Sequence, residues 1–277
     1  MKLLLVGLAV IQFILAGPLP KEYVENTPEN LELIRSGNYK QDIETLGGQF
    51  EGDMVLEERQ RRALLGLEKT GLINTDYRWP DGIVPYVLAD GYFTQGQKDQ
   101  IERGLKAIED ASCIRFVPHT NEENYVEIIG EPTGCWSQVG NLRRGKQQLN
   151  LQLFEPGVGC FRSGTVVHEF LHTLGFYHMQ SATERDDYVL IAWQHIIPGM
   201  EHNFNKYGAD VITNFGVEYD VVSVMHYNAY AFTRNGFATI IPYDISLIDG
   251  MGQHIGMTDL DIKRLNAMYE CAPRDEK

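Results

Sequence analysis

Residues 168–178 read HEFLHTLGFYH, a pattern that predicts both the architecture and the chemistry of the chain. His168 and His172 are four positions apart, so on a helix both imidazoles project from one face and can bind a single ion. Gly175 can adopt the left-handed conformation that ends a helix, which lets the chain turn back and His178 supply a third nitrogen. Three neutral imidazoles suit Zn²⁺ and leave its fourth position open for water, as in a catalytic zinc site.

Glu169 directly follows the first of these histidines, where its carboxylate can take a proton from that water. The alternative is an ordinary amphipathic helix with satisfied histidines, because apolar residues such as Phe170 are expected in any buried helix. HExxH alone is a moderate signal, but its extension through Gly175 to His178 is far rarer. The pattern therefore predicts one zinc ion per chain, held by the three histidines.

A second element lies downstream, where residues 223–227 read SVMHY. Metzincin metalloproteases combine the extended zinc motif with a methionine in a tight turn beneath the histidines. By this resemblance, Met225 is that methionine and packs against the metal site. Taken alone, Met225 would be an ordinary core methionine, since flexible thioethers fill irregular gaps. Its position after the zinc motif favours the Met-turn.

The flanking residues resemble the astacin family of zinc metalloendopeptidases, which belongs to the metzincins. That family extends the zinc motif as HExxHxxGFxHExxRxDRDxYV, and this chain has Gly175-Phe176 followed by RDDYV at 185–189. The cysteine switch of matrix metalloproteases, PRCGxPD, is absent from the sequence. The chain departs from the pattern at Met179, where the family has a glutamate that receives the ammonium of the newly cut N-terminus. A methionine cannot pair with that charge.

The resemblance covers roughly residues 70–271 and implies an α+β, zincin-like catalytic domain. Two subdomains would flank an active-site cleft: an N-terminal half with a mixed sheet and the zinc helix, and an irregular C-terminal half ending in a helix. Periodicity and capping signals predict helices over 94–110, over 163–174 and from the capping box at Thr258 and Asp261. They predict strands over 83–88, 114–117, 125–129 and 148–153, the last with one solvent-exposed face.

Residues 1–17 have the pattern of a secretory signal peptide, with a short charged end, an apolar run and Ala16-Gly17 at the cut. A membrane anchor is the alternative, but the run of about 14 apolar residues is too short to span hydrocarbon. Residues 18–69 are charged with little apolar periodicity and resemble a propeptide, which leaves 70–277 as the catalytic domain. We therefore expect a secreted, extracellular protein.

Within the expected propeptide, residues 50–53 read FEGD. Astacin precursors carry FxGD, whose aspartate binds the zinc and excludes the catalytic water, and by resemblance Asp53 has this role. A carboxylate oxygen is a good zinc ligand. The alternative is a solvated Gly-Asp turn. The resemblance implies a latent zymogen that an activating protease cuts after Lys69, with Arg62 as the alternative basic site.

The chain contains four cysteines, which allow three disulfide pairings in an oxidising compartment. The family pairs the first with the fourth and the second with the third. Carried over, this implies the bonds Cys113–Cys271 and Cys135–Cys160. The net charge is −14, and most of the excess lies in residues 70–277. An acidic domain argues against nucleic acid or an anionic membrane surface as a partner.

The resemblance implies an endopeptidase that acts on protein or peptide substrates, and we expect the chain to be a monomer. Glu169 would be the general base, and Tyr227 would ligate the metal at rest and then hydrogen-bond the oxyanion of the transition state. The alternative is that Tyr227 has a structural role only. The competing function is a catalytically impaired secreted binding protein of the same fold, but Glu169 and all three histidines are present. A structural zinc domain is disfavoured because no thiolate belongs to the ligand cluster.

Overall fold

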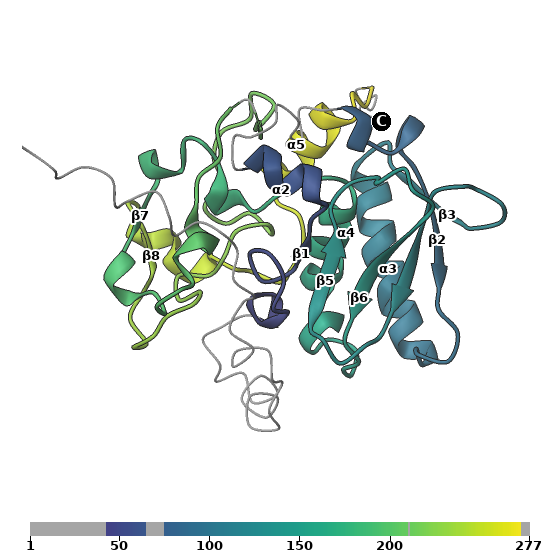
Figure 1. Cartoon of the computed structure of the whole chain (residues 1–277), viewed down its shortest axis with the longest axis horizontal. Coiled ribbons are helices and arrows are strands. Elements are labelled where there is room, and N and C mark those ends of the chain that lie inside the picture. The colour runs from purple at the N-terminus through teal and green to yellow at the C-terminus, as the bar shows by residue number, and fades with distance from the viewer. Residues whose placement is uncertain (1–42, 65–74, 210, 273–277) are drawn as a thin grey trace, which may run out of the picture.

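The computed structural model describes residues 43–64, 75–209 and 211–272 (Figure 1). The expected signal peptide, the first part of the expected propeptide and Lys69 lie outside the described residues. The strands are β1 (Met54–Val55), β2 (Ile83–Leu88), β3 (Arg115–Pro118), β4 (Tyr125–Ile129), β5 (Cys135–Gln138), β6 (Lys146–Leu151), β7 (Val189–Ile191) and β8 (Ile240–Pro242). The α-helices are α2 (Glu58–Leu64), α3 (Gln95–Ala111), α4 (Ser163–Thr173) and α5 (Asp259–Met268).

A six-stranded mixed sheet in the order β1-β5-β6-β4-β2-β3 forms the first half of the fold. Strands β3, β2, β4 and β6 are parallel to one another, and β5 runs antiparallel to β6. Strand β1 pairs with β5 in parallel, with Met54 opposite Ser137. Strand β1 lies within residues 18–69, the expected propeptide, whose described residues 43–64 are called the pro-segment below. This segment occupies the outer edge of β5.

Helices α3 and α4 lie side by side along this sheet (Figure 1). Thr94 caps α3 through a capping box with Gln97, and Ile101, Leu105 and Ile108 form its buried face. A Cβ atom at Gly104 would lie 2.5 Å from a side-chain carbon of Val166 in α4, so this glycine allows the two helices to approach closely. Helix α4 therefore packs against α3 on one side and against β5 and β6 on another, with ten of its residues buried.

The chain after α4 is irregular and forms a second hydrophobic cluster around the β7–β8 pair, with Phe204 fully buried. Helix α5 follows, and Thr258 caps it through a capping box with Asp261, as the sequence predicts. Disulfides join Cys113 to Cys271 and Cys135 to Cys160, which is the pairing that the resemblance implies. The first of them links the residues after α3 to those after α5.

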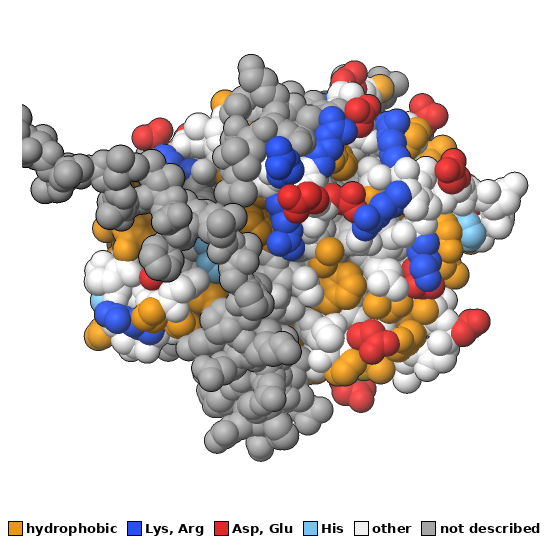
Figure 2. Space-filling view, viewed as in Figure 1, with side chains coloured by type: hydrophobic (Ala, Val, Ile, Leu, Met, Phe, Trp, Pro, Cys, Tyr) orange, Lys and Arg blue, Asp and Glu red, His pale blue; other side chains and the backbone are white. Residues whose placement is uncertain are grey.

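The pro-segment, the described part of the expected propeptide, contains the regular elements β1 and α2 although its sequence shows little apolar periodicity. Arg59, Arg61 and Arg62 lie on the exposed side of α2, whereas Gln60 and Ala63 are buried. The Gln60 side chain donates to the Val139 carbonyl at 2.9 Å, which attaches the helix to the residue that follows β5. Figure 2 shows Lys and Arg side chains gathered on the face that carries α2.

The α+β class and two strands, 83–88 and 125–129, are confirmed at their predicted bounds. The strand predicted over 148–153 is observed two residues earlier, and its supposed solvent-exposed face is wrong. Asn150 is fully buried there, and its amide donates to the carbonyls of Glu131 and Gly134 at 3.0 and 2.6 Å. None of the helices among the described residues has the length and apolar character needed to cross a bilayer.

Candidate metal centre and active site

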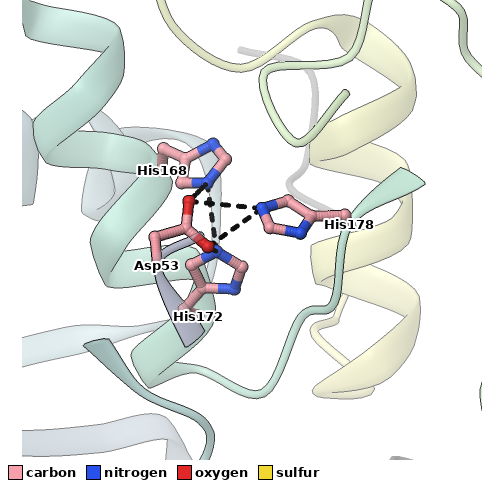
Figure 3. A group of neighbouring side chains, drawn as sticks. All are labelled: Asp53, His168, His172 and His178. Atoms are coloured by element: carbon pink, nitrogen blue, oxygen red, sulfur yellow. Dashed lines mark hydrogen bonds and ion pairs between the residues drawn. The ribbon is translucent and has the colours of Figure 1, made fainter. Parts of the chain in front are cut away.

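Helix α4 and the turn after it bring the three histidines of the motif together (Figure 3). His168 and His172 are four residues apart in α4, so both project from one face of that helix. The helix ends at Thr173, and Gly175 has φ 109° with its N–H donating to the His172 carbonyl at 2.8 Å. This left-handed turn, as predicted, directs His178 back toward the helix. Ligand atoms of the three histidines and Asp53 lie within 4.8 Å of one another.

The second nitrogen of each imidazole is held by an oxygen acceptor. Nδ1 of His168 donates to the Val224 carbonyl at 2.7 Å and Nδ1 of His172 to the Phe176 carbonyl at 2.7 Å. Nδ1 of His178 donates to the Glu51 carboxylate at 2.9 Å. In the neutral form of each imidazole these acceptors fix the hydrogen on Nδ1 and leave the lone pair on Nε2, and such outer contacts commonly orient histidine ligands of metals.

These lone pairs face one another, because the Nε2 atoms of His168 and His172 are 3.0 Å apart. Two lone pairs at that distance repel unless a cation lies between them. Burial also lowers the pKa of His172 to about 4, so its imidazole is neutral, which is the form that binds metals. The donor set of three nitrogens and a carboxylate therefore fits a tetrahedral Zn²⁺ ion.

Asp53 reaches the cluster from the pro-segment. Its oxygens are 3.2 Å from Nε2 of His168, 3.4 Å from that of His172 and 3.2 Å from that of His178, and the residue is fully buried. Burial would raise the carboxyl pKa of Asp53, but the imidazole of His178 holds it well below the usual range. In turn, burial would lower the pKa of His178, but the Asp53 and Glu51 carboxylates raise it to about 9. The preceding Gly52 has φ +92°, and a Cβ atom there would lie 2.5 Å from the Glu44 carbonyl oxygen.

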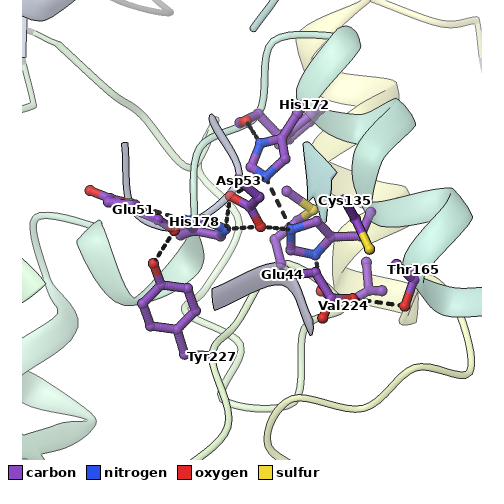
Figure 4. A network of polar contacts seen from close by, with 12 residues as sticks. Glu44, Glu51, Asp53, Cys135, Thr165, His172, His178, Val224 and Tyr227 are labelled. Atoms are coloured by element: carbon purple, nitrogen blue, oxygen red, sulfur yellow. Dashed lines mark hydrogen bonds and ion pairs between the residues drawn. The ribbon is translucent and has the colours of Figure 1, made fainter. Parts of the chain in front are cut away.

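Two further carboxylates of the pro-segment contact the same region (Figure 4). The Glu51 carboxylate holds His178, as described above. Glu44 accepts from the Thr165 hydroxyl at 2.7 Å and lies 3.4 Å from Nδ1 of His254. Burial would raise the pKa of Glu44, but the charge of His254 lowers it to about 2. Sequence reasoning missed both residues; Glu51 is inside the FEGD motif, whereas no sequence signal pointed to Glu44.

Glu169 lies on the same helix, fully buried, and neither of its carboxylate oxygens has a hydrogen-bond partner among the described residues. Burial raises its carboxyl pKa well above the usual range, and the charges of Asp53 and Glu44 raise it further. A cation bound at the three histidines would lower the carboxyl pKa of Glu169. An unpartnered carboxylate beside a metal centre is suited to accept and return a proton.

The SVMHY segment contacts the metal cluster, because the carbonyl of its Val224 accepts from Nδ1 of His168. Met225 is 3% exposed, and its carbonyl accepts from the N–H of Met179 at 2.8 Å, so the Met-turn contacts the residue after the third histidine. The hydroxyl of Tyr227 donates to the carbonyl of Glu51 (Figure 4). Met179 contacts the guanidinium of Arg264, which also lies 3.0 Å from Asp261.

A zinc-binding helix with a third histidine after a glycine turn, above a methionine turn and beside a mixed sheet, defines the metzincin class of metalloproteases. The model of one metzincin family, the Astacin peptidase family, matches residues 71–270. The chain belongs to the astacin family. Zinc is the metal of that family, and the cluster of three histidines and Asp53 can hold it.

Three relatives illustrate the similarity. Meprin A subunit beta of Rattus norvegicus is 40% identical over 94% of this chain, which spans only 34% of that protein. Seminal metalloprotease 1 of Drosophila melanogaster is 36% identical over 83% of this chain and 90% of its own length. The structure of high choriolytic enzyme 1, a hatching enzyme zinc-protease from Oryzias latipes, superimposes with a TM-score of 0.65 at 35% identity, covering 72% of this chain and 97% of that chain.

Proposed function

We propose that this chain is the latent precursor of a secreted zinc endopeptidase that hydrolyses peptide bonds in proteins. The observation that carries the proposal is the convergence of three imidazoles on one point, each with its outer nitrogen held by an acceptor. His168, His172 and His178 would hold the ion. Membership of a peptidase family and relatives named as metalloproteases support the same activity.

In this proposal Zn²⁺, when bound, polarises the scissile carbonyl and acidifies water. A carboxylate oxygen of Glu169 takes the proton of the attacking water and then delivers it to the leaving amine. The lack of competing partners around Glu169 among the described residues keeps both oxygens available for this transfer. The Tyr227 hydroxyl donates to the oxyanion of the transition state once the Glu51 carbonyl no longer occupies it.

Latency would follow from three contacts of the pro-segment. The Asp53 carboxylate occupies the position beside the histidines that the catalytic water would take. The Tyr227 hydroxyl donates to the Glu51 carbonyl and is not available to a substrate. Strand β1 covers the outer edge of β5, so an extended substrate cannot pair there. Release of residues 18–69 would uncover all three, which gives the cut chain, residues 70–277, its activity.

An activating protease with trypsin-like specificity would cut after Lys69. The alternative site, Arg62, belongs to α2, and a helix must unwind before a protease can bind its backbone in extended form. Residues 1–17 would direct secretion. A monomer is expected because one chain supplies every residue of the cluster, and the acidic net charge disfavours nucleic acid and anionic membranes as partners.

The test compares zinc content and casein cleavage for the uncut chain, the trypsin-cut chain and a trypsin-cut Glu169→Gln variant. We expect one zinc per chain in all three and activity only in the second. A zinc-loaded cut chain that cleaves casein no faster than Glu169→Gln would reject the endopeptidase and leave the binding-protein alternative.

A further inference from the structure

The Glu51 carboxylate lies next to His178 beside the metal cluster (Figure 4), and the side chains that bind it are called the Glu51 pocket below. Glu51 is fully buried. One oxygen accepts from the Tyr207 hydroxyl at 2.5 Å and the other from Nδ1 of His178 at 2.9 Å. The Ser181 hydroxyl lies between them, 3.1 and 3.2 Å from the two oxygens. A buried carboxylate with directional donors on both oxygens is the pattern of a built binding site.

All three donors belong to the catalytic domain, whereas the carboxylate belongs to the pro-segment. Glu51 reaches them from a strained backbone, with φ 49°, and its carbonyl is held by Tyr227. The donors are 127, 130 and 156 residues away along the chain. Cleavage before the catalytic domain would therefore remove the carboxylate and leave His178, Ser181 and Tyr207 in place.

Loss of Glu51 has an energetic consequence for these donors. A buried donor left without an acceptor is costly, so the emptied pocket must take up water or a new acceptor. Because Tyr207 and His178 donate to different oxygens, a carboxylate satisfies both. A glutamine amide could turn its NH₂ group toward the Tyr207 hydroxyl, which accepts as well as donates, but its hydrogen bonds would be neutral. A carboxylate makes charge-assisted bonds that are roughly twice as strong. The pocket therefore discriminates an acid from its amide.

We propose that His178, Ser181 and Tyr207 form a carboxylate-binding subsite, filled by Glu51 in the precursor and by an acidic side chain of a peptide ligand in the cut enzyme. The inference rests on the proposed function in one respect, the departure of the pro-segment. Asp53 lies two residues after Glu51, so the preferred ligand carries its acidic residue two positions before the group that faces the metal.

The experiment measures binding rather than catalysis. The full chain carrying Glu169→Gln is cut with trypsin, the released segment is removed by gel filtration with a chelator, and zinc is restored. Fluorescently labelled peptides of sequence QFEGDMV, residues 49–55, and the same peptide with Glu51→Gln are titrated by polarisation. We expect the acidic peptide to bind at least tenfold more tightly, while both peptides keep Asp53 for the zinc.

Variants assign the discrimination to the pocket. Tyr207→Phe and Ser181→Ala should each reduce the acid-to-amide ratio to threefold or less, mainly by weakening the acidic peptide. Tyr177→Phe is the matched control, because its ring packs 6.3 Å from that of Tyr207 but its hydroxyl does not bond to Glu51. Circular dichroism and zinc content check folding, and Ser181→Ala carries the test if Tyr207→Phe does not fold.

Equal affinity for the two peptides, no binding of either, or a ratio unaffected by Ser181→Ala would overturn the subsite. These outcomes are separate from failure of the proposed function. A cut wild-type chain without casein cleavage would reject the peptidase, while the binding ratio could still be read on the zinc-loaded cut protein.

Discussion

Glu169 and Asp53 are buried carboxylates of one site with opposite protonation behaviour. Burial raises the pKa of Glu169, whose oxygens have no partner among the described residues. Burial acts on Asp53 in the same direction, but contact with His178 outweighs it and lowers that pKa. The first carboxylate is therefore suited to carry a proton, and the second to remain an anion at the cation site.

Glu169→Gln should leave zinc content and folding unchanged in the cut chain and reduce kcat/KM by on the order of 10³-fold, since general-base catalysis contributes roughly 10²–10⁴-fold. Gln has the same volume but accepts no proton. Metal analysis and casein assays on matched preparations measure the two effects. Activity within a few-fold of the parent would remove Glu169 from the role of base.

Tyr227→Phe should lower kcat by on the order of 10²-fold while KM changes little, because the hydroxyl is proposed to stabilise only the transition state. Steady-state kinetics of the cut enzyme with a fluorogenic peptide separate the two constants. Tyr219→Phe, a buried tyrosine whose hydroxyl bonds to Nε2 of His226 instead, is the control. A change confined to KM would indicate that Tyr227 packs against substrate.

Elements differ in how far the sequence predicts them. Helix α3 and strands β2 and β4 follow from periodicity and capping, which act within a few residues. Strand β5 escapes prediction because its four residues, CWSQ, have neither a long apolar run nor a turn signal. Strand β1 has two residues and exists through its pairing with β5. A strand that forms only by pairing with a distant strand has no pattern in its own sequence from which it could be predicted.

Within the site, residues that are close in sequence are predictable and residues that are distant in sequence are not. Its histidines and Glu169 all lie within residues 168–178, so spacing alone predicts that they meet. The pocket of Glu51 depends on Tyr207, which is 156 residues away, and no spacing rule connects them. The motif FEGD identifies the location of Asp53 but not the separate contacts of Glu51.

Gly52 lies in the tight turn that precedes β1. Gly52→Ala should loosen the pro-segment and raise the basal activity of the uncut chain several-fold, because its Cβ would lie 2.5 Å from the Glu44 carbonyl at φ +92°. Gly91→Ala is the control, with φ +82° and no atom within 4 Å of the added carbon. Asp53→Ala should raise basal activity through loss of the ligand itself. Unchanged latency in Gly52→Ala would mean that the turn tolerates the side chain.

At the scale of the whole molecule, the metal cluster joins three parts of the chain. His168 and His172 come from α4, which packs on the sheet; His178 leads into the second half; and Asp53 comes from the pro-segment. Met54 and Leu56 of the pro-segment share a third hydrophobic cluster with Tyr177 and Tyr207. Since in the uncut chain the ion would take ligands from all three parts, its binding energy should stabilise their arrangement as a unit.

Removal of zinc from the uncut chain by a chelator should therefore lower Tm by about 6–12 °C. A stabilisation of about 3 kcal/mol corresponds to an ion at a few hundred times its Kd, and each kcal/mol shifts Tm by roughly 2–4 °C in a domain of this size. Differential scanning calorimetry with and without chelator measures the shift, and added zinc should reverse it. In Asp53→Ala the shift should be smaller, because one ligand is missing from the assembled site. An unchanged Tm in protein that metal analysis finds free of zinc would mean that the hydrophobic clusters and disulfides alone hold the three parts together.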